Sequence, residues 1–224
     1  MIYAISDLHG QYKLWTKVKQ FLHSDDKLIC LGDNIDRGPD GIKIYQEQKE
    51  IGTIILKGNH EDMAAAAIPV LCEGKYNSMV KLWFANGGMA TWESVSEDKE
   101  SALQIATEFQ NLPTNITYTF EHYSVVCDHC GFTPGSPYQK FWDREHFYDE
   151  WDDDYYDQGV YIVHGHTPVQ YLIDHLGLPH TKELKIARYA DCHKIDIDLG
   201  CFASHKTALL NLKTLIPTYF KEVI

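Results

Sequence analysis

The sequence predicts an α/β protein whose N-terminal part is a βαβαβ unit. Seven short apolar runs have the length and composition of strands: 1–6, 27–32, 53–58, 123–128, 160–165, 194–200 and 207–212. Amphipathic stretches separate the first three runs, and strands connected in this way are parallel, with crossover helices between them. We therefore expect a single α/β domain over residues 1–224, with a mainly helical segment at about 60–113.

Two helices are predicted inside the βαβαβ unit. The first covers residues 11–23 and places five apolar side chains at helical spacing: Leu14, Trp15, Val18, Phe21 and Leu22. The second covers residues 40–51, with Pro39 just before it and Gly52 just after it. Proline and glycine are typical of these two positions at the ends of helices.

The middle and C-terminal parts of the chain show different patterns. The helical segment is interrupted by the sequence NGGM at 86–89, which predicts a break between two helices. After Pro113, short strands dominate to the C-terminus. An acidic, aromatic-rich run at 148–157 interrupts them, and because charge runs are usually solvated we expect a loop there, to which the sequence assigns no role.

Composition and charge exclude several classes of protein. The chain of 224 residues is 44% hydrophobic and 23% charged, as in ordinary globular proteins. No run approaches 18 apolar residues and the N-terminus has no basic region before an apolar one, so we expect neither a membrane span nor a signal peptide, and a cytoplasmic location. Six cysteines without a secretion signal are expected to be free thiols. The net charge of −12 disfavours nucleic acid as a partner.

Polar clusters recur directly after the predicted strands. They are SDLHG, GDNIDRG, GNHE, CDHCG and HGHT, after the first to the fifth strand respectively. Ligands of open α/β sheets bind beyond the carboxyl ends of the strands, so these five loops can converge on one site. A single Asp or His in a loop is commonly a solvent-exposed residue without a specific role, but five clusters with the same placement indicate a functional site.

The candidate ligands in these clusters offer carboxylate, amide oxygen and imidazole groups and no thiolate. The candidate ligands are Asp7, His9, Asp33, Asn59, His129 and His166. Mixed oxygen and nitrogen ligation suits Mn, Fe or Zn. Six ligands are too many for one tetrahedral ion with an open position, and they suit a two-metal site that shares a carboxylate and a water.

Three of these clusters form an ordered set of motifs, D-x-H-G, G-D-x-x-D-R-G and G-N-H-E, about 25 residues apart within residues 7–61. Their order and spacing resemble those of the metallophosphoesterase superfamily, and the second and third motifs resemble those of its PPP-type serine/threonine protein phosphatases of the compact bacterial and phage kind. DHCG and HGHT extend the resemblance to about residue 167, and IDIDLGCF at 195–202 is similar to the closing strand of that family. The resemblance implies a calcineurin-like fold, a two-sheet sandwich flanked by helices, with the site at the strand ends.

The resemblance also implies a role for each motif residue. Asp7 and His9 would bind the first metal and Asp33 would bridge both. The second metal would be held by Asn59, His129 and His166. Two such dications lower the pKa of a bridging water, which yields a hydroxide for in-line attack on phosphorus at neutral pH.

Three further residues match the catalytic and phosphate-binding positions of the family. His60 matches the general acid that protonates the leaving alkoxide, and Asp36 matches the carboxylate that orients this histidine. A carboxylate partner would also raise the pKa of His60 and keep it protonated. Arg37 matches a phosphate-binding arginine, whose planar guanidinium can grip two oxygens.

A second phosphate-binding arginine is expected because the family commonly has one. The chain has only three arginines. Arg144, in the sequence FWDRE, resembles the tryptophan-then-arginine element of the bacterial members, and Arg188 is the fallback. A solvated surface arginine is the simplest alternative for either.

Three positions depart from the family pattern. Ser6 stands where a glycine often precedes the first metal aspartate, a change that we expect to be tolerated. Asp128 and Cys130 flank His129 in place of the usual His-Ala-Gly or His-Gly-Gly loop, which leaves the identity of the second metal open.

Other readings of the motifs fit less well. Cys127-x-x-Cys130 is followed by a Gly-Phe-Thr-Pro loop and has no partner pair, unlike a redox motif or zinc finger. HEDMA at 60–64 lacks the second histidine of a metalloprotease helix. No P-loop and no G-x-S-x-G sequence is present.

Three functions are consistent with the motifs. We expect a metal-dependent protein serine/threonine phosphatase with two divalent ions, most simply Mn, with Fe or Zn as alternatives. Its partner would be a phosphorylated protein or peptide, or a small phosphate ester. The alternative is a symmetrical dinucleoside tetraphosphate hydrolase, but such enzymes often lack the aspartate of DRG and carry GNHD, whereas this chain keeps Asp36 and Glu61. A non-catalytic binding module would have lost a ligand or His60, and none is lost.

Overall fold

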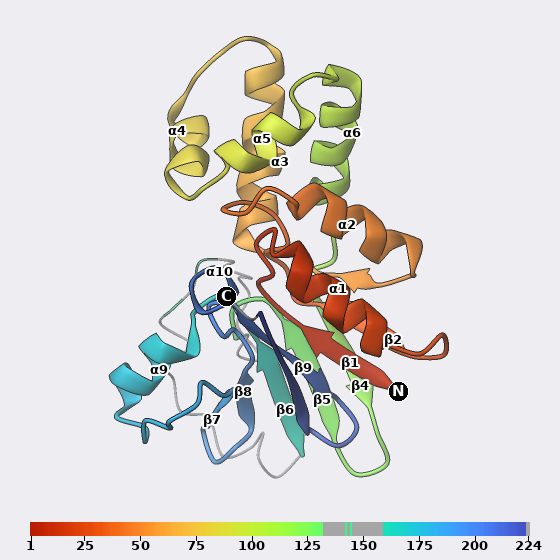
Figure 1. The fold of residues 1–224 in the computed structure, drawn as a ribbon, viewed down its shortest axis with the longest axis vertical. Coiled ribbons are helices and arrows are strands. Elements are labelled where there is room, and N and C mark those ends of the chain that lie inside the picture. Colours follow the sequence, from red (N-terminus) through yellow and green to blue (C-terminus); the bar gives the residue numbers. More distant parts are fainter. Residues whose placement is uncertain (132–141, 143, 145–158, 223–224) are drawn as a thin grey trace.

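Two five-stranded sheets and a group of helices at one end make up the described part of the protein (Figure 1). The computed structural model describes residues 1–131, 142, 144 and 159–222. The strand order is β10-β9-β1-β2-β3 in the first sheet and β4-β5-β6-β8-β7 in the second. This architecture confirms the expected α/β fold with two sheets and flanking helices.

The first sheet contains the predicted βαβαβ unit. Its strands are β1 (Ile2–Ile5), β2 (Lys27–Cys30), β3 (Ile54–Ile55), β9 (Lys206–Asn211) and β10 (Pro217–Lys221). β1 pairs in parallel with β2, with Ile5 opposite Cys30, and β2 pairs in parallel with β3. The carboxyl ends of these three strands therefore meet at one edge of the sheet, which is where their polar loops begin.

The second sheet combines parallel and antiparallel pairs. Its strands are β4 (Asn115–Thr119), β5 (Ser124–Asp128), β6 (Val160–His164), β7 (Ala187–Tyr189) and β8 (Lys194–Asp196). β5, β6 and β8 run parallel to one another. This brings the loops after β5 and β6, which contain His129 and His166, to the same edge of the second sheet.

Two separate apolar layers hold the sheets in place. Between the sheets, the buried side chains include Ala4, Ile29, Val125 and Val163. On the other face of the first sheet, α1 (Tyr12–Phe21) and α2 (Gly41–Glu50) bury Leu14, Trp15, Val18, Ile44 and Tyr45. Each helix has an apolar side toward the sheet, as their sequence periodicity predicts.

The helical segment forms a lobe above the strand ends (Figure 1). We define this helical lobe as α3 (Asn59–Cys72), α4 (Ser78–Ala85), α5 (Met89–Val95) and α6 (Lys99–Gln110). α4 ends and α5 begins around the NGGM sequence, so the predicted break is confirmed. The lobe packs its own buried residues, among them Trp83 and Phe109, into the same apolar cluster as α1 and α2.

Some elements differ from those expected at the sequence level. The strand predicted at 194–200 ends at Asp196. Beyond it, the Asp196 side chain accepts from the Asp198 N–H at 2.9 Å and the Asp198 side chain accepts from the Gly200 N–H at 2.7 Å, and α10 (Cys201–Ser204) follows. α9 (Val169–Leu176) packs Val169 and Leu172 against β7. The acidic run at 148–157 lies outside the described residues.

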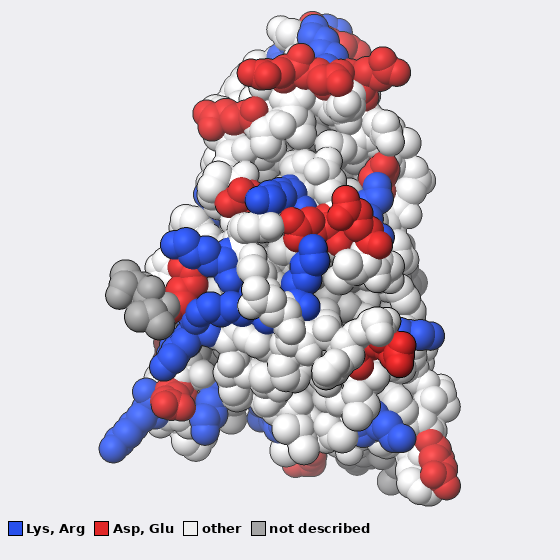
Figure 2. Space-filling view, turned by 45° about the vertical axis from the view of Figure 1, so that its right-hand side comes forward, with Lys and Arg blue, Asp and Glu red and all other residues white. Residues whose placement is uncertain are grey.

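Charge is distributed unevenly over the surface. Figure 2 shows acidic side chains gathered over the far end of the helical lobe, with lysine and arginine side chains more frequent toward the sandwich. The lobe contains eight acidic residues and three lysines between residues 59 and 110. Among the described residues, no helix combines the length and the hydropathy needed to cross a membrane.

Candidate active site

Backbone hydrogen bonds join the loops that follow the parallel strands. The Asp33 carbonyl accepts from the His9 N–H at 2.9 Å, and the Asn34 carbonyl accepts from the Gly10 N–H at 2.8 Å. In the second sheet, the His129 carbonyl accepts from the Gly165 N–H at 3.0 Å. The first two bonds fix the loop after β1 against the loop after β2, and the third fixes the loops after β5 and β6.

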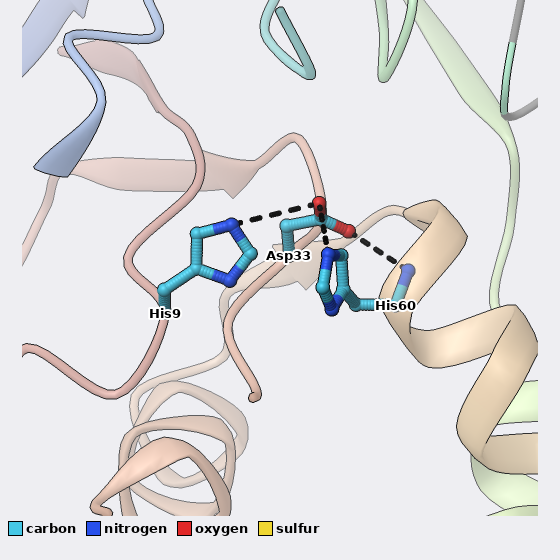
Figure 3. A group of neighbouring side chains, drawn as sticks. All are labelled: His9, Asp33 and His60. Carbon is cyan, nitrogen blue, oxygen red and sulfur yellow. Dashed lines mark hydrogen bonds and ion pairs between the residues drawn. The ribbon is translucent and has the colours of Figure 1, made fainter. Parts of the chain in front are cut away.

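Asp33 lies at the centre of the site. One of its carboxylate oxygens, Oδ2, is 3.8 Å from His9 Nε2 and 3.8 Å from His60 Nε2. Figure 3 shows both imidazoles facing this carboxylate, His9 from the loop after β1 and His60 from the start of α3, and their ring centres are 4.7 Å apart. These three side chains form one group with the geometry to hold a metal ion.

A second group shares the same carboxylate. Asp33, His129 and His166 also bring ligand atoms close enough together to hold an ion, and Asp33 Oδ1 is 3.4 Å from His129 Nε2. The side-chain oxygen of Asn59 lies 3.0 Å from His129 Nε2 and 2.9 Å from His166 Nδ1. Asp33 is thus common to both groups, as expected of a bridging ligand.

Asp7 is beside these groups but belongs to neither. Its Oδ2 accepts hydrogen bonds from the His166 N–H at 3.1 Å and from the Ser6 hydroxyl. A Cβ on Gly165 would overlap both the Ser6 hydroxyl and Asp7 Oδ2, so only glycine allows the two loops to approach this closely. Ser6, which departs from the family pattern, therefore fits here by binding the neighbouring aspartate.

His60 and Asp36 form a buried pair. His60 Nδ1 is 2.6 Å from Asp36 Oδ2, and both residues are at most 1% exposed. Asp36 also accepts from Trp83 Nε1 at 2.8 Å and from the Thr91 hydroxyl at 2.6 Å. The pair predicted from the sequence is therefore in contact, and the helical lobe supplies two hydrogen bonds to it that the sequence did not reveal.

The three arginines occupy different environments. Arg37 is exposed, its N–H donates to the Gly87 carbonyl at 3.0 Å, and its Nη2 is 3.3 Å from His60 Nε2. Arg144 Nε lies 3.3 Å from the hydroxyl of Thr167, the neighbour of His166. The guanidinium of Arg188 donates to the Leu215 carbonyl. Arg37 and Arg144 thus border the cluster from its two sides, whereas Arg188 is bound to the turn before β10.

The loops of the site have an unusual backbone conformation. Among the described residues, eleven non-glycine residues have a positive φ, and six of them, with φ between 42° and 69°, are in these loops: Asp7, His9, Asp33, Asp36, Arg37 and His166. This left-handed region costs an L-residue about 1–2 kcal/mol. Its concentration in the predicted site residues indicates that the surrounding hydrogen bonds impose the conformation, as is common at functional sites.

Glu61 is a further site residue. It binds backbone N–H groups of the Asp33 loop and of Gly58, and not the side chain of a candidate metal ligand. Its Oε2 accepts from the Asp33 N–H at 2.9 Å and the Gly58 N–H at 3.0 Å, while Oε1 accepts from the Asn34 N–H at 3.0 Å. Glu61 is completely buried. The sequence singled it out only as part of GNHE, and its role in fixing the Asp33 loop became visible from the structure.

Burial and neighbouring charges shift the pKa values of the site in opposite directions. Burial would raise the pKa of Asp33, but His129, His60 and His9 outweigh it and hold the pKa well below its ordinary value. Burial would lower the pKa of His60, but Asp33 and Asp36 raise it. Burial, followed by the charge of Asp33, raises the pKa of Asp7 to about 6.

The donor set fits divalent metal ions. His129 Nδ1 is 2.8 Å from the Leu31 carbonyl and His9 Nδ1 is 2.9 Å from the Ile35 carbonyl, so these nitrogens must carry the hydrogen and Nε2 is left as a lone-pair donor. Among the residues that the structure describes, His166 Nε2 is buried and has no hydrogen-bond partner. A buried imidazole nitrogen needs a partner, and a metal ion would provide one.

A two-sheet α/β sandwich with buried carboxylate, amide and imidazole donors at its strand ends belongs to the class of metal-assisted hydrolases. The family can be stated more closely. Residues 1–205 match the model of the calcineurin-like phosphoesterases, and the chain belongs to this family. The resemblance of the motifs is thereby confirmed.

Individual relatives bear different names. Serine/threonine-protein phosphatase 2 of Escherichia coli (strain K12) is 31% identical over 140 residues, which are 61% of this chain and 61% of the relative. A symmetrical bis(5'-nucleosyl)-tetraphosphatase of Nitrosospira multiformis is 35% identical over 65 residues, 27% of this chain and 24% of the relative. A crystal structure described as a candidate diadenosine tetraphosphatase superposes with a TM-score of 0.63 at 15% identity, covering 98% of this chain and 92% of that one.

These similarities differ in what they establish. The structural similarity, at 15% identity, shows the fold alone. The match to the Escherichia coli phosphatase spans about three fifths of that relative's length. The family is therefore shown, and the reaction and substrate are matters of proposal.

Proposed function

We propose that the chain is a dinuclear-metal phosphoprotein phosphatase that hydrolyses phosphoserine and phosphothreonine. One observation carries the proposal, namely the contact of a buried His60–Asp36 pair with the Asp33 cluster on one side and Arg37 on the other. An acid, a ligand cluster and a phosphate-binding group are then adjacent. Metal-assisted hydrolysis of a phosphomonoester can use all three.

The ligand assignment is part of the same proposal. Asp7 and His9 would bind one ion, Asp33 both ions, and Asn59, His129 and His166 the other. We propose Mn²⁺ as the metal, with Fe or Zn as alternatives, because oxygen and imidazole donors suit these ions. When bound, two such ions would lower the pKa of a coordinated water and neutralise charge on the phosphate.

The arginines would hold the phosphate from two sides. Arg37 is fixed through its backbone to the helical lobe, and Arg144 lies against the loop after β6. A guanidinium can donate two parallel hydrogen bonds to phosphate oxygens, which orients the ester as well as binding it. With the phosphate between them, the leaving oxygen would face His60.

His60 would act as the general acid. Its Nδ1 is bonded to Asp36, so its Nε2 is the nitrogen that can give a proton to the leaving oxygen. Asp33 and Asp36 raise the pKa of His60 against the effect of burial, which favours the protonated form that an acid needs. A serine alkoxide is a poor leaving group, and the proton makes its departure possible.

A tetraphosphatase function has support from the relatives, because a symmetrical bis(5'-nucleosyl)-tetraphosphatase is similar to 27% of the chain. The longer match to a serine/threonine phosphatase favours our first proposal. So does the retention of both Asp36 and Glu61, each of which is buried and hydrogen-bonded. A cytoplasmic location belongs to the proposal too, and all six cysteines are free thiols, as such a location allows.

The decisive experiment compares three substrates with the same enzyme preparation and added Mn²⁺. They are a phosphoserine peptide, diadenosine tetraphosphate and p-nitrophenyl phosphate. We expect the highest kcat/KM for the phosphopeptide. A kcat/KM more than about tenfold higher for the dinucleotide, a difference of 1.4 kcal/mol in transition-state binding, would overturn the proposal in favour of the alternative.

A further inference from the structure

We propose that Thr91 and Trp83, in the helical lobe, are positioning residues for the general acid and act on His60 through Asp36. The inference rests on the proposed function, in which His60 protonates the leaving oxygen. Neither residue lies in a motif of the site. Trp83 is 47 residues and Thr91 55 residues from Asp36 along the chain.

The hydrogen bonds around Asp36 leave little freedom to its carboxylate. Oδ2 is 2.6 Å from His60 Nδ1 and accepts from Trp83 Nε1 at 2.8 Å, while Oδ1 accepts from the Thr91 hydroxyl at 2.6 Å. The Thr91 hydroxyl also accepts from the Asp36 N–H at 2.9 Å. Asp36, Trp83 and Thr91 are at most 2% exposed, so water cannot replace these donors. Thr91 thus fixes both the backbone and the side chain of Asp36.

The two donors come from both sides of one turn. Trp83 is on α4 and Thr91 is on α5, and the turn between them accepts the Arg37 N–H at the Gly87 carbonyl. A Cβ on Gly88 would lie 2.5 Å from ring atoms of Trp83, so glycine is needed there for the indole to approach the turn. The α4–α5 turn therefore holds the acid pair and the phosphate-binding arginine in one arrangement.

The chemistry of the leaving group makes this role measurable. In hydrolysis, the water oxygen forms a bond to phosphorus, the bond from phosphorus to the leaving oxygen breaks, and the proton of His60 moves to that oxygen. A misaligned acid slows this step in proportion to the basicity of the leaving oxygen. Phenyl phosphate and p-nitrophenyl phosphate have nearly the same shape, but phenoxide is the more basic leaving group and depends more on the acid.

The test measures kcat for both aryl phosphates with Thr91→Val, Thr91→Ser and Trp83→Phe. Valine keeps the shape of threonine without its hydroxyl, serine keeps the hydroxyl, and phenylalanine removes the indole N–H. We expect kcat of Thr91→Val to fall at least ~10-fold more for phenyl phosphate than for p-nitrophenyl phosphate, a part of the ~10²–10⁴-fold that a general acid contributes. Trp83→Phe should change the ratio in the same direction, and Thr91→Ser should restore it.

Val95→Ala is the matched control, because Val95 is buried on the same helix as Thr91 and has no polar group. It should lower thermal stability and leave the ratio of the two kcat values as in the parent enzyme. Equal losses for both aryl phosphates with Thr91→Val, or a ratio that Thr91→Ser does not restore, would overturn the inference while the proposed function stands. If the parent enzyme hydrolyses neither aryl phosphate nor a phosphopeptide, the proposed function itself fails.

Discussion

The two halves of the site are built differently. The loops of the first sheet contribute Asp33 and Asp36 and the start of α3 contributes His60, and both aspartates are held by several hydrogen bonds. The second sheet contributes His129 and His166, and one buried nitrogen of His166 has no hydrogen-bond partner in the described part of the chain. One half is therefore a fixed network of charged groups, and the other half presents imidazole nitrogens that would bind a metal ion.

This difference predicts which substitutions should lower activity through metal binding and which should lower it through proton transfer or folding. The shared carboxylate of Asp33 connects the halves, since both ligand groups include it. Changes at Asp33 should affect both halves, and changes elsewhere should separate them.

Asp33→Asn should have the largest effect. The amide keeps the shape of the carboxylate but removes the charge that both ligand groups share, so both ions should be lost. We expect metal affinity to fall by more than the ~10–100-fold that the loss of an outer partner costs, and activity to fall with it. Metal analysis after dialysis measures the occupancy, and two bound ions per chain would contradict the bridging role of Asp33.

His60→Asn should have the next largest effect and should act only on the first half. Asparagine cannot donate a proton to an alkoxide, so kcat for a phosphopeptide should fall by ~10²–10⁴-fold. Metal content should stay at the level of the parent enzyme. Because His60 also lies in the group with His9 and Asp33, a loss of one ion in this variant would show that His60 is a ligand and would sink its assignment as the acid.

Glu61→Gln should destabilise the first half without removing a candidate metal ligand. Glu61 accepts from three backbone N–H groups, and a glutamine has only one side-chain oxygen, so at least one buried donor would be left unsatisfied. We expect a loss of about 1–3 kcal/mol in the free energy of unfolding. Denaturant unfolding measures it, with Asp62→Asn as the control one residue along α3. Equal stability of the two variants would contradict this role.

Arg144→Ala should have the smallest effect and should act on the second half. Loss of one phosphate contact should raise KM for p-nitrophenyl phosphate by about tenfold, the equivalent of 1.4 kcal/mol, with unchanged metal content. Arg188→Ala is the matched control, because Arg188 binds the Leu215 carbonyl away from the site. If Arg188→Ala raised KM and Arg144→Ala did not, the second phosphate-binding arginine would have been chosen wrongly.

The sequence was sufficient to predict the fold class and the cluster around Asp33. Each of the candidate ligands belongs to a polar cluster at the end of a short apolar run, and parallel strands bring such positions together whatever the details of packing. The break at 86–89 was predictable as well, because two adjacent glycines interrupt a helical pattern.

The contacts of the helical lobe with Asp36 could not be predicted in the same way. Trp83 and Thr91 sit on the buried sides of α4 and α5, where their positions resemble those of ordinary core residues. Their partner is in a loop of the first sheet, and no local pattern connects the two. Glu61 was ambiguous for a related reason, since its three partners are backbone groups that any sequence would offer.

The hydrogen bonds from the lobe to Asp36 make general acid catalysis depend on the thermal stability of the lobe. Helices at the periphery of a protein commonly open at lower free energy than the sheets they cover. Opening of the α4–α5 turn would release the acid pair at once, while the Asp33 cluster stayed anchored to both sheets. On heating, the enzyme should therefore first lose activity toward esters with basic leaving groups, while it keeps its metal ions and its activity toward esters with good leaving groups. The remaining activity should be lost at a higher temperature, so that thermal inactivation has two stages.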